Sequence, residues 1–165
     1  MKIKIFVLMI LLFITVAAYD VFKIYKSPSE LPDLNFTTLS NKHFSLSSLR
    51  GKAVLITFWA TDCPSCIKDI PHLIKLYQDY HAKGLEIIAI AMAYNPPNYV
   101  VSMTKEKALP YEVVFDLNGN YAHAFGDVSL TPNSFLIAPD STIVLHKLGL
   151  LDLEKMKMEI EGFIK

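Results

Sequence analysis

The sequence contains only two cysteines, Cys63 and Cys66, and they lie three residues apart. Cysteines at positions i and i+3 of a first helical turn share one helix face, where their sulfur atoms can form a disulfide. A helix N-terminus carries unpaired N–H groups and partial positive charge, which stabilise the thiolate that attacks other disulfides. We therefore predict that Cys63 is the exposed nucleophile and that Cys66, one turn deeper, resolves the mixed disulfide.

Other roles for a cysteine pair fit this sequence less well. A structural disulfide across so short a loop removes only about 2 kcal/mol of chain entropy from the unfolded state. A zinc site needs four ligands, and there is no second cysteine pair. The histidines are scattered along the chain: His43, His72, His81, His123 and His146. We therefore interpret the pair as redox-active and expect neither a metal nor a cofactor.

The residues around the cysteines predict a strand that leads into a helix. Residues 53–59 (AVLITFW) form a continuous run of apolar, β-branched and aromatic residues, which is typical of a strand buried on both faces. From Cys63 to about His81, apolar residues recur at helical spacing, and Gly84 follows as a stop. The cysteines are thus expected where a buried strand meets the first turn of a helix.

The rest of the chain adds alternating strands and helices. The expected strands are 34–39 and 43–46 as a small hairpin, 85–92, 113–115, and a late hairpin of 134–137 and 143–148. The expected helices are 96–107, 119–125 and 152–164. This order predicts an α/β fold with a central mixed β-sheet and helices on both faces. Early strands joined by helices should pair in parallel, and the late hairpin antiparallel.

Composition narrows the possible functions. The 165 residues include 16 basic and 16 acidic side chains, so the formal net charge is zero. Without a basic cluster in the body of the chain, we expect no nucleic-acid partner. The apolar fraction of 52% excludes a disordered chain, and the length predicts a single folded domain.

The N-terminus predicts export from the cytoplasm. Residues 5–18 (IFVLMILLFITVAA) carry no charge and follow two lysines, a pattern typical of signal peptides and of short membrane anchors. We expect residues 1–22 to be a signal anchor or a signal peptide, residues 23–33 a linker and residues 34–165 the folded domain. The domain would then lie on the periplasmic or extracytoplasmic face, tethered to the inner membrane by residues 5–22 unless the segment is cleaved.

Three stretches of sequence resemble a known family. Residues 58–66 (FWATDCPSC) look like the thioredoxin-fold signature F-W-A-x-x-C-x-x-C. Residues 44–52 (FSLSSLRGK) are similar to the lead-in of TlpA/ResA-like membrane-anchored thiol–disulfide oxidoreductases, relatives of the AhpC/TSA and redoxin proteins. Residues 130–137 (LTPNSFLI) match that family's stretch around a cis-proline. The resemblance implies a thioredoxin-like three-layer sandwich with an N-terminal β-hairpin extension.

The resemblance also implies roles for residues around the cysteines. Thr131-Pro132 would carry a cis peptide bond against the first cysteine's sulfur, with the Thr131 backbone available to an extended substrate strand. Trp59 would pack under the active-site loop. Between the cysteines stand Pro64 and Ser65 rather than a histidine. Because a neighbouring imidazolium would favour a strongly oxidising disulfide, its absence favours a reductant.

Three residues depart from the family pattern. Asp62 stands directly before Cys63, where this superfamily often has tryptophan, and its carboxylate would oppose the thiolate unless it serves only as a helix cap. On the preceding strand, Thr57 stands where thioredoxin has an aspartate, and Tyr94 stands where ResA-like proteins have a glutamate. The buried acid that assists proton transfer in many relatives is therefore missing at these positions, and we name no general base.

The sequence thus predicts an exported thiol–disulfide oxidoreductase that reduces disulfides in exported partner proteins. Its electrons would return from a membrane donor of the DsbD/CcdA type, since exported compartments are oxidising. The processes that this family supplies with electrons include cytochrome c maturation and related thiol maintenance. One alternative is a peroxiredoxin, although Ile56 and Ala60 break the P-x-x-x-[T/S]-x-x-C pattern. Another is a Sco-like copper assembly chaperone with His123 or His146 as a distal ligand.

Overall fold

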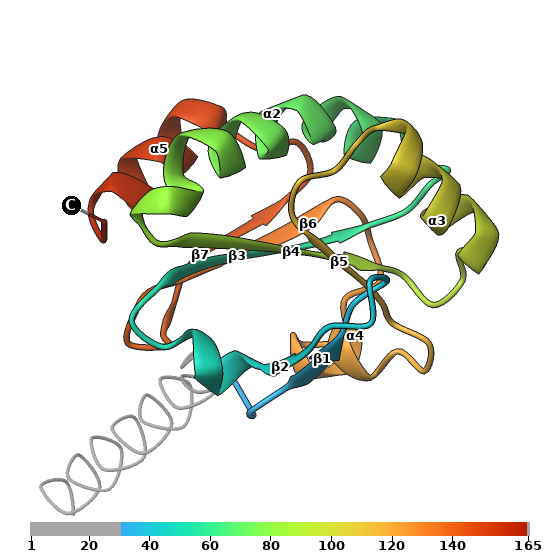
Figure 1. Ribbon diagram of the computed structural model, residues 1–165, viewed down its shortest axis with the longest axis horizontal. Coiled ribbons are helices and arrows are strands. Elements are labelled where there is room, and N and C mark those ends of the chain that lie inside the picture. The colour runs from blue at the N-terminus through green and yellow to red at the C-terminus, as the bar shows by residue number, and fades with distance from the viewer. Residues whose placement is uncertain (1–30, 165) are drawn as a thin grey trace, which may run out of the picture.

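The computed structural model describes residues 31–164, which build a five-stranded mixed sheet between two covering layers (Figure 1). The strand order across the sheet is β5-β4-β3-β6-β7. The expected signal or anchor segment, residues 1–22, lies outside the described residues. Within residues 31–164, no helix is both long enough and apolar enough to cross a membrane.

The middle strand of the sheet is β3 (Ala53–Trp59), and all seven of its residues are buried. It pairs in parallel with β4 (Leu85–Ala91), which pairs in parallel with β5 (Glu112–Phe115). On its other side β3 pairs antiparallel with β6 (Asn133–Ile137), which forms a hairpin with β7 (Ile143–Leu148). The predicted mixed sheet is confirmed, including the direction of each pairing.

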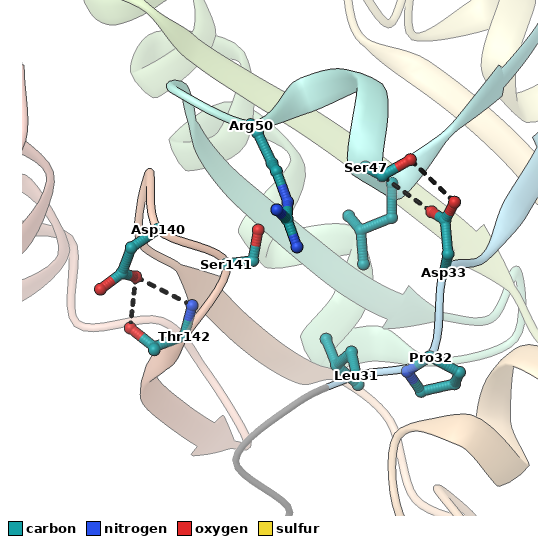
Figure 2. Close-up of a pocket in the computed structure, with 9 residues that line it drawn as sticks. Leu31, Pro32, Asp33, Ser47, Arg50, Asp140, Ser141 and Thr142 are labelled. Atoms are coloured by element: carbon teal, nitrogen blue, oxygen red, sulfur yellow. Dashed lines mark hydrogen bonds between the residues drawn. The ribbon is translucent and has the colours of Figure 1, made fainter.

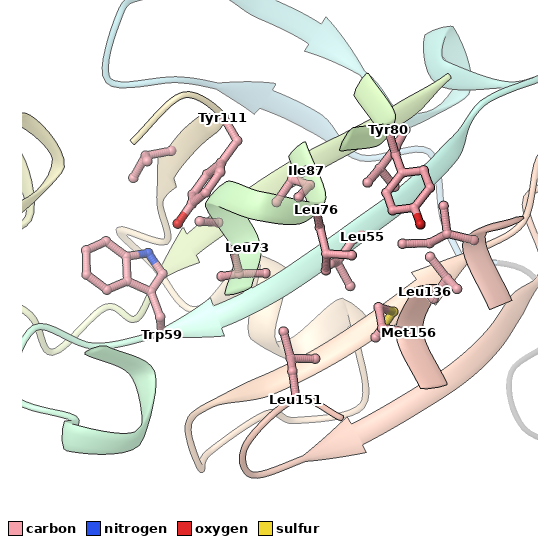
Figure 3. Packing of buried hydrophobic residues seen from close by; sticks show 14 of the residues in the cluster. Leu55, Trp59, Leu73, Leu76, Tyr80, Ile87, Tyr111, Leu136, Leu151 and Met156 are labelled. Carbon is pink, nitrogen blue, oxygen red and sulfur yellow. The ribbon is translucent and has the colours of Figure 1, made fainter. Parts of the chain in front are cut away.

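Three helices cover one face of the sheet: α2 (Pro64–Tyr80), α3 (Pro97–Glu106) and α5 (Leu153–Glu161) (Figure 1). Alternate residues of a strand point to opposite faces, so every second side chain of β3 lies beneath these helices. Leu55 packs there in one cluster with Leu76 of α2 and Met156 of α5, as Figure 3 shows. This layer contains the helix that begins at the cysteines.

Shorter elements cover the opposite face. β1 (Asn35–Thr37) and β2 (His43–Ser45) form the predicted antiparallel hairpin, and the 3₁₀ helix η1 (Leu46–Leu49) follows directly. The short helix α4 (Asn120–Ala124) completes this layer (Figure 1). Phe58 of β3 points into this layer and belongs to its apolar cluster. The predicted arrangement of helices on both faces, with an N-terminal hairpin, is confirmed.

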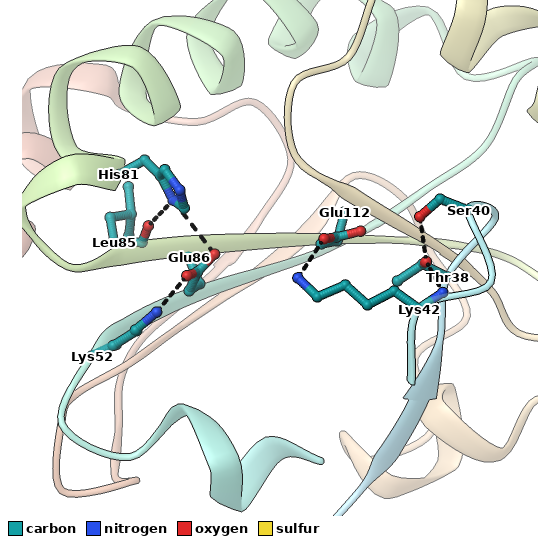
Figure 4. Close-up of polar contacts among 8 residues, drawn as sticks. All are labelled: Thr38, Ser40, Lys42, Lys52, His81, Leu85, Glu86 and Glu112. Carbon is teal, nitrogen blue, oxygen red and sulfur yellow. Dashed lines mark hydrogen bonds and ion pairs between the residues drawn. The ribbon is translucent and has the colours of Figure 1, made fainter. Parts of the chain in front are cut away.

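Two ion pairs join strands from distant parts of the chain (Figure 4). Lys42, in the turn between β1 and β2, bonds to Glu112 of β5 at 2.8 Å, and Lys52 bonds to Glu86 of β4 at 2.7 Å. Ion pairs near the surface contribute only about 0–1 kcal/mol each. The stability of the fold therefore depends mainly on the two apolar layers on either side of β3.

Candidate active site

Cys63 and Cys66 form a disulfide at the N-terminus of α2, with their Cα atoms 5.2 Å apart. Cys63 is the N-cap of the helix, and its Sγ accepts a hydrogen bond from the Cys66 backbone N–H at 3.1 Å. Cys63 is partly exposed, whereas Cys66 is only 3% exposed. The sulfur atoms are therefore unequal in accessibility. The alternative in which Asp62 caps the helix is wrong, because Cys63 occupies that position.

The first turn of α2 favours negative charge on the Cys63 sulfur. Pro64 opens the helix, and the turn contains no acidic residue, so nothing in it offsets the positive end of the helix dipole. Pro64 is exposed and Ser65 partly exposed. Asp62 lies just outside the helix and is exposed, which leaves its carboxylate screened by water.

The loop that leads to Cys63 is held by Asn95, a residue just after β4 that is 3% exposed. The Oδ1 atom of Asn95 accepts hydrogen bonds from the backbone N–H of Thr61 at 2.7 Å and from its hydroxyl at 2.8 Å. The side-chain amide of Asn95 donates to the Met92 carbonyl at 3.3 Å. These bonds fix the loop to the end of the neighbouring strand. Sequence reasoning missed Asn95, because asparagine before two prolines indicates an ordinary turn.

A buried carboxyl group lies one helical turn beyond Cys66. Asp69 is 2% exposed; its two carboxylate oxygens accept from the Leu151 backbone N–H at 3.2 and 3.1 Å, and Oδ1 lies 3.5 Å from Nδ1 of His72. Burial raises the pKa of Asp69 above its usual 3.8, and the bonds to Leu151 and His72 only partly offset that rise. Thr57 and Tyr94 leave both of the family's usual positions without an acid, and Asp69 is a buried acid at a third position, which the sequence analysis did not identify. The C-x-x-D spacing was the available signal, since i and i+3 share a helix face.

Cys66 and Asp69 line one small cavity of about 10 Å³ beneath the active-site loop. Trp59, at the end of β3, forms another part of its wall and is 5% exposed. Thr57 also lines the cavity, and its hydroxyl is paired with the Ser134 hydroxyl at 2.9 Å. The rest of the wall consists of Ile70, Leu73, Ala89, Leu109, Tyr111 and Pro132.

The Thr131-Pro132 peptide bond is cis, as the resemblance implied. Pro132 shares the small cavity with Cys66, and its carbonyl accepts from the Gly149 N–H at 2.8 Å. Within residues 31–164, the Thr131 N–H and carbonyl take part in no backbone hydrogen bond. These groups remain available to an extended chain, and their role in binding a substrate stays a prediction.

Comparison of the sequence with known protein families is consistent with a redox-active cysteine pair at this site. Residues 26–158 match the family model described as Redoxin. The chain belongs to the redoxin family. Proteins named thiol-disulfide oxidoreductase ResA, from Bacillus anthracis and Halalkalibacterium halodurans, are each 34% identical to this redoxin. The two alignments cover 82% and 77% of its chain, and 75% and 70% of theirs. The expected enzyme class, a thiol–disulfide oxidoreductase, is thereby confirmed.

Solved structures of similar proteins confirm the predicted fold. A Neisseria meningitidis protein described as a thioredoxin matches this redoxin with a TM-score of 0.76 and 31% identity, over 82% of this chain and 90% of that one. A Chlorobium tepidum protein described as the thiol:disulfide interchange protein DsbE matches with a TM-score of 0.73 and 25% identity, over 81% and 94% of the two chains. The sheet and its layers are thus those of a thioredoxin-like fold.

The two histidines considered for copper binding have other partners in this redoxin. Nε2 of His146 lies 2.7 Å from Oδ1 of Asn133, and the His146 ring stacks on Phe135. Nδ1 of His123 lies 2.6 Å from Asp127. In the part of the chain that the structure describes, no three His, Cys, Asp or Glu side chains form a group that could hold a metal ion. No specific observation favours the Sco-like alternative.

A larger cavity, of about 200 Å³, lies at the other end of the sheet (Figure 2). Arg50 lines it from just ahead of β3, whereas the cysteines follow that strand. Its two carboxylates are already hydrogen-bonded, Asp33 to Ser47 and Asp140 to Thr142, and these bonds lower the pKa of each. We assign this cavity no part in the thiol chemistry.

The Asn95 contacts predict how much each partner contributes to stability. Asn95→Ala should lower the free energy of unfolding by about 1–3 kcal/mol, because the partly buried Thr61 N–H and hydroxyl would both lose their acceptor. Thr61→Val removes only the hydroxyl bond and should cost about 1 kcal/mol. Urea unfolding followed by circular dichroism measures both. A larger loss in Thr61→Val than in Asn95→Ala would contradict this description of the loop.

The raised pKa of Asp69 predicts a pH-dependent contribution to stability. A carboxyl group with a higher pKa in the folded than in the unfolded state stabilises the fold fully below about 3.8, and this contribution is lost as pH rises through the folded-state pKa. Asp69→Asn removes the titration but keeps an acceptor for the Leu151 N–H. The stability of the variant relative to the native chain should therefore increase from pH 3.8 towards neutrality. Urea unfolding at successive pH values, with exposed Asp62→Asn as control, measures this; a pH-independent difference would count against it.

Proposed function

We propose that this redoxin reduces disulfide bonds in exported partner proteins, with Cys63 and Cys66 as a dithiol that is oxidised once per cycle. The observation that supports it most directly is the asymmetry of the pair. Cys63 is partly exposed and caps a helix, whereas Cys66 is buried beside the Asp69 carboxyl group. An accessible sulfur with N–H donors is suited to attack a disulfide, and a shielded one to release the partner.

In the first step the Cys63 thiolate attacks one sulfur of the partner's disulfide. A bond forms between Cys63 and that sulfur, the partner's S–S bond breaks, and the other partner sulfur leaves as a thiolate that takes a proton from water. The product is a mixed disulfide, in which Cys66 still carries its thiol proton.

In the second step Cys66 gives up that proton and attacks the Cys63 sulfur. The Cys63–Cys66 disulfide forms, and the partner's second sulfur leaves as a thiolate, so two electrons have passed from the dithiol to the partner. Asp69 is the group suited to take the Cys66 proton, because it lines the same cavity and its raised pKa lets it hold a proton more readily than an exposed carboxylate does.

The residues around Cys63 support reduction over oxidation. The two residues between the cysteines, Pro64 and Ser65, offer no cation to stabilise the thiolate. A strongly oxidising disulfide needs a stabilised reduced form, which such cations provide. We propose that the partner is an exported protein with cysteines to be reduced, such as the haem-site cysteines of a cytochrome c. Residues 5–22 would tether the domain outside the cytoplasm, and a DsbD/CcdA-type membrane donor would return the electrons.

A reducing role predicts a low reduction potential. Equilibration of the full-length chain with glutathione or dithiothreitol buffers should give a potential far below the about −120 mV of strong oxidants, in the range of about −200 to −270 mV typical of reductants. Gel-shift alkylation of free thiols measures the reduced fraction. A potential near −120 mV would overturn the proposed direction of electron flow.

The different roles of Cys63 and Cys66 predict which cysteine variant captures a partner protein. Cys66→Ala cannot perform the second step, so the Cys63 mixed disulfide should accumulate as adducts that dithiothreitol releases. Cys63→Ala is the matched control and should accumulate far fewer adducts, since its remaining sulfur is buried. Mass spectrometry of the released proteins identifies the partner. Equal adducts in the two variants would show that Cys63 is not the attacking residue.

A further inference from the structure

The loops at the end of the sheet that carries Cys63 contain acidic residues and no basic ones. β3, β4, β5 and β7 all end at this edge, and β6 begins there. The loops are residues 60–63, 92–96, 116–119, 125–132 and 149–152. They contain four aspartates and no lysine, arginine or histidine, although the whole chain has 16 basic and 16 acidic residues. The lysines closest to them in sequence belong to α2, β7 and α5: Lys68, Lys147 and Lys155.

Three of these four aspartates already have partners. Asp116 is 1% exposed and accepts two backbone N–H groups of α4. Asp152 caps α5, and Asp127 lies 2.6 Å from Nδ1 of His123. Asp62 is exposed, and it takes part in none of the ion pairs in the part of the chain that the structure describes. The carboxylate directly before Cys63 is therefore the one available to a partner protein.

An exposed tyrosine belongs to the loop that is bonded to the Asp62 loop. The backbone N–H and the hydroxyl of Thr61 both donate to Oδ1 of Asn95, at 2.7 and 2.8 Å. Asp62 and Tyr94 are the sequence neighbours of these two bonded residues, and Tyr94 is 58% exposed. The hydrogen bonds thus bring together two loops that each present an exposed side chain, a carboxylate on one and an aromatic ring on the other.

A carboxylate and an aromatic ring attract the same kind of group. A lysine or arginine can form an ion pair with a carboxylate, and its cation is also attracted to the face of a tyrosine ring. The aliphatic stem of such a side chain can lie along the ring while its charged end remains at the carboxylate. An acidic side chain in the same place would be repelled, and no cation in these loops would compensate.

We propose that Asp62 and Tyr94 select partner proteins that carry a lysine or arginine next to the cysteine attacked by Cys63. The inference rests on the proposed function and names the class of partner for it. The two residues determine specificity and take no part in the bonds that form and break. Because the Asp62 carboxylate alone opposes the Cys63 thiolate, a partner cation paired with Asp62 also removes that opposition as the disulfide is presented.

Small disulfides of different charge test the role of Asp62. The reduced full-length chain is mixed rapidly with cystamine, which is cationic, with neutral bis(2-hydroxyethyl) disulfide, or with anionic dithiodiglycolate, and the remaining free thiols are alkylated. Asp62→Asn should lower the ratio of the cystamine rate to the neutral rate about threefold, the effect of one exposed ion pair. It should raise the corresponding dithiodiglycolate ratio. High salt should lower the cystamine ratio of the native chain in the same way.

Rate ratios remove any change that the substitution makes to the general reactivity of Cys63. Asp127→Asn is the matched control, because it removes the same charge from the same end of the sheet, at an aspartate that already has His123 as its partner. It should leave the cystamine ratio unchanged. An unchanged ratio in Asp62→Asn, or an equal loss in Asp127→Asn, would overturn the assignment of specificity to Asp62.

Disulfide-bridged peptides test the role of Tyr94. Two peptides that differ only in a lysine or a glutamine next to one cysteine are compared as substrates of the reduced full-length chain. Tyr94→Leu keeps apolar bulk but removes the aromatic face, so the ratio of the lysine rate to the glutamine rate should fall about threefold. Tyr99→Leu is the matched control, since Tyr99 is 59% exposed but lies on α3. An equal fall in both variants would overturn the role of Tyr94.

These ratios separate the inference from the proposed function, because they compare substrates of one protein and do not depend on its reduction potential. A cystamine preference that Asp62→Asn removes, in a chain with a strongly oxidising potential, would support the specificity surface and overturn the reductant role. A low potential without any preference for cationic disulfides would support the reductant role and overturn the specificity surface.

Discussion

Burial of β3 on both faces is the constraint on which the rest of the site depends. A shift of this strand by one residue would exchange Leu55 and Phe58 between two close-packed apolar layers that fit different side chains, so its register is fixed by packing. The end of the strand is fixed with it, and Trp59 is held where the loop to Cys63 begins. Because Asn95 ties that loop to the end of the parallel neighbour β4, packing of the sheet also determines where the first sulfur lies.

The sulfur of Cys66 lies near a carboxyl group whose burial is energetically unfavourable. A carboxyl group in a protein interior without a full ion pair opposes folding when it is charged, and Asp69 has only the Leu151 N–H and the more distant His72 to compensate. The site therefore contains a group that weakens the fold near neutral pH, beside the cysteine that would lose a proton in the proposed cycle. Such local costs are typical of catalytic sites, where an unusual proton affinity is needed.

Local patterns determine what could be predicted from the sequence. The apolar run of β3 and the spacing of Cys63 and Cys66 describe one strand and one helical turn, and the structure has both where they were expected. The spacing of Cys66 and Asp69 indicates only that they share a helix face; the burial of Asp69 could not be predicted, because the N–H that covers it belongs to Leu151, 82 residues further along the chain. The same holds for Asn95, whose partner Thr61 lies 34 residues earlier. When residues far apart in the sequence bury one another, the sequence shows no periodic pattern that would predict it.

The position of the chain's first described residue has a consequence for how the molecule could be held. Leu31 lines the cavity beside Arg50, ahead of β3, and the cysteines follow that strand. Seven residues of extended chain separate these ends by about 20 Å. A tether joined before Leu31 would therefore hold the domain by the end remote from its sulfur atoms. The reactive surface would face away from the point of attachment. The length of the tether would then determine how far from the membrane the domain can reach, and it would not limit the size of the partner protein.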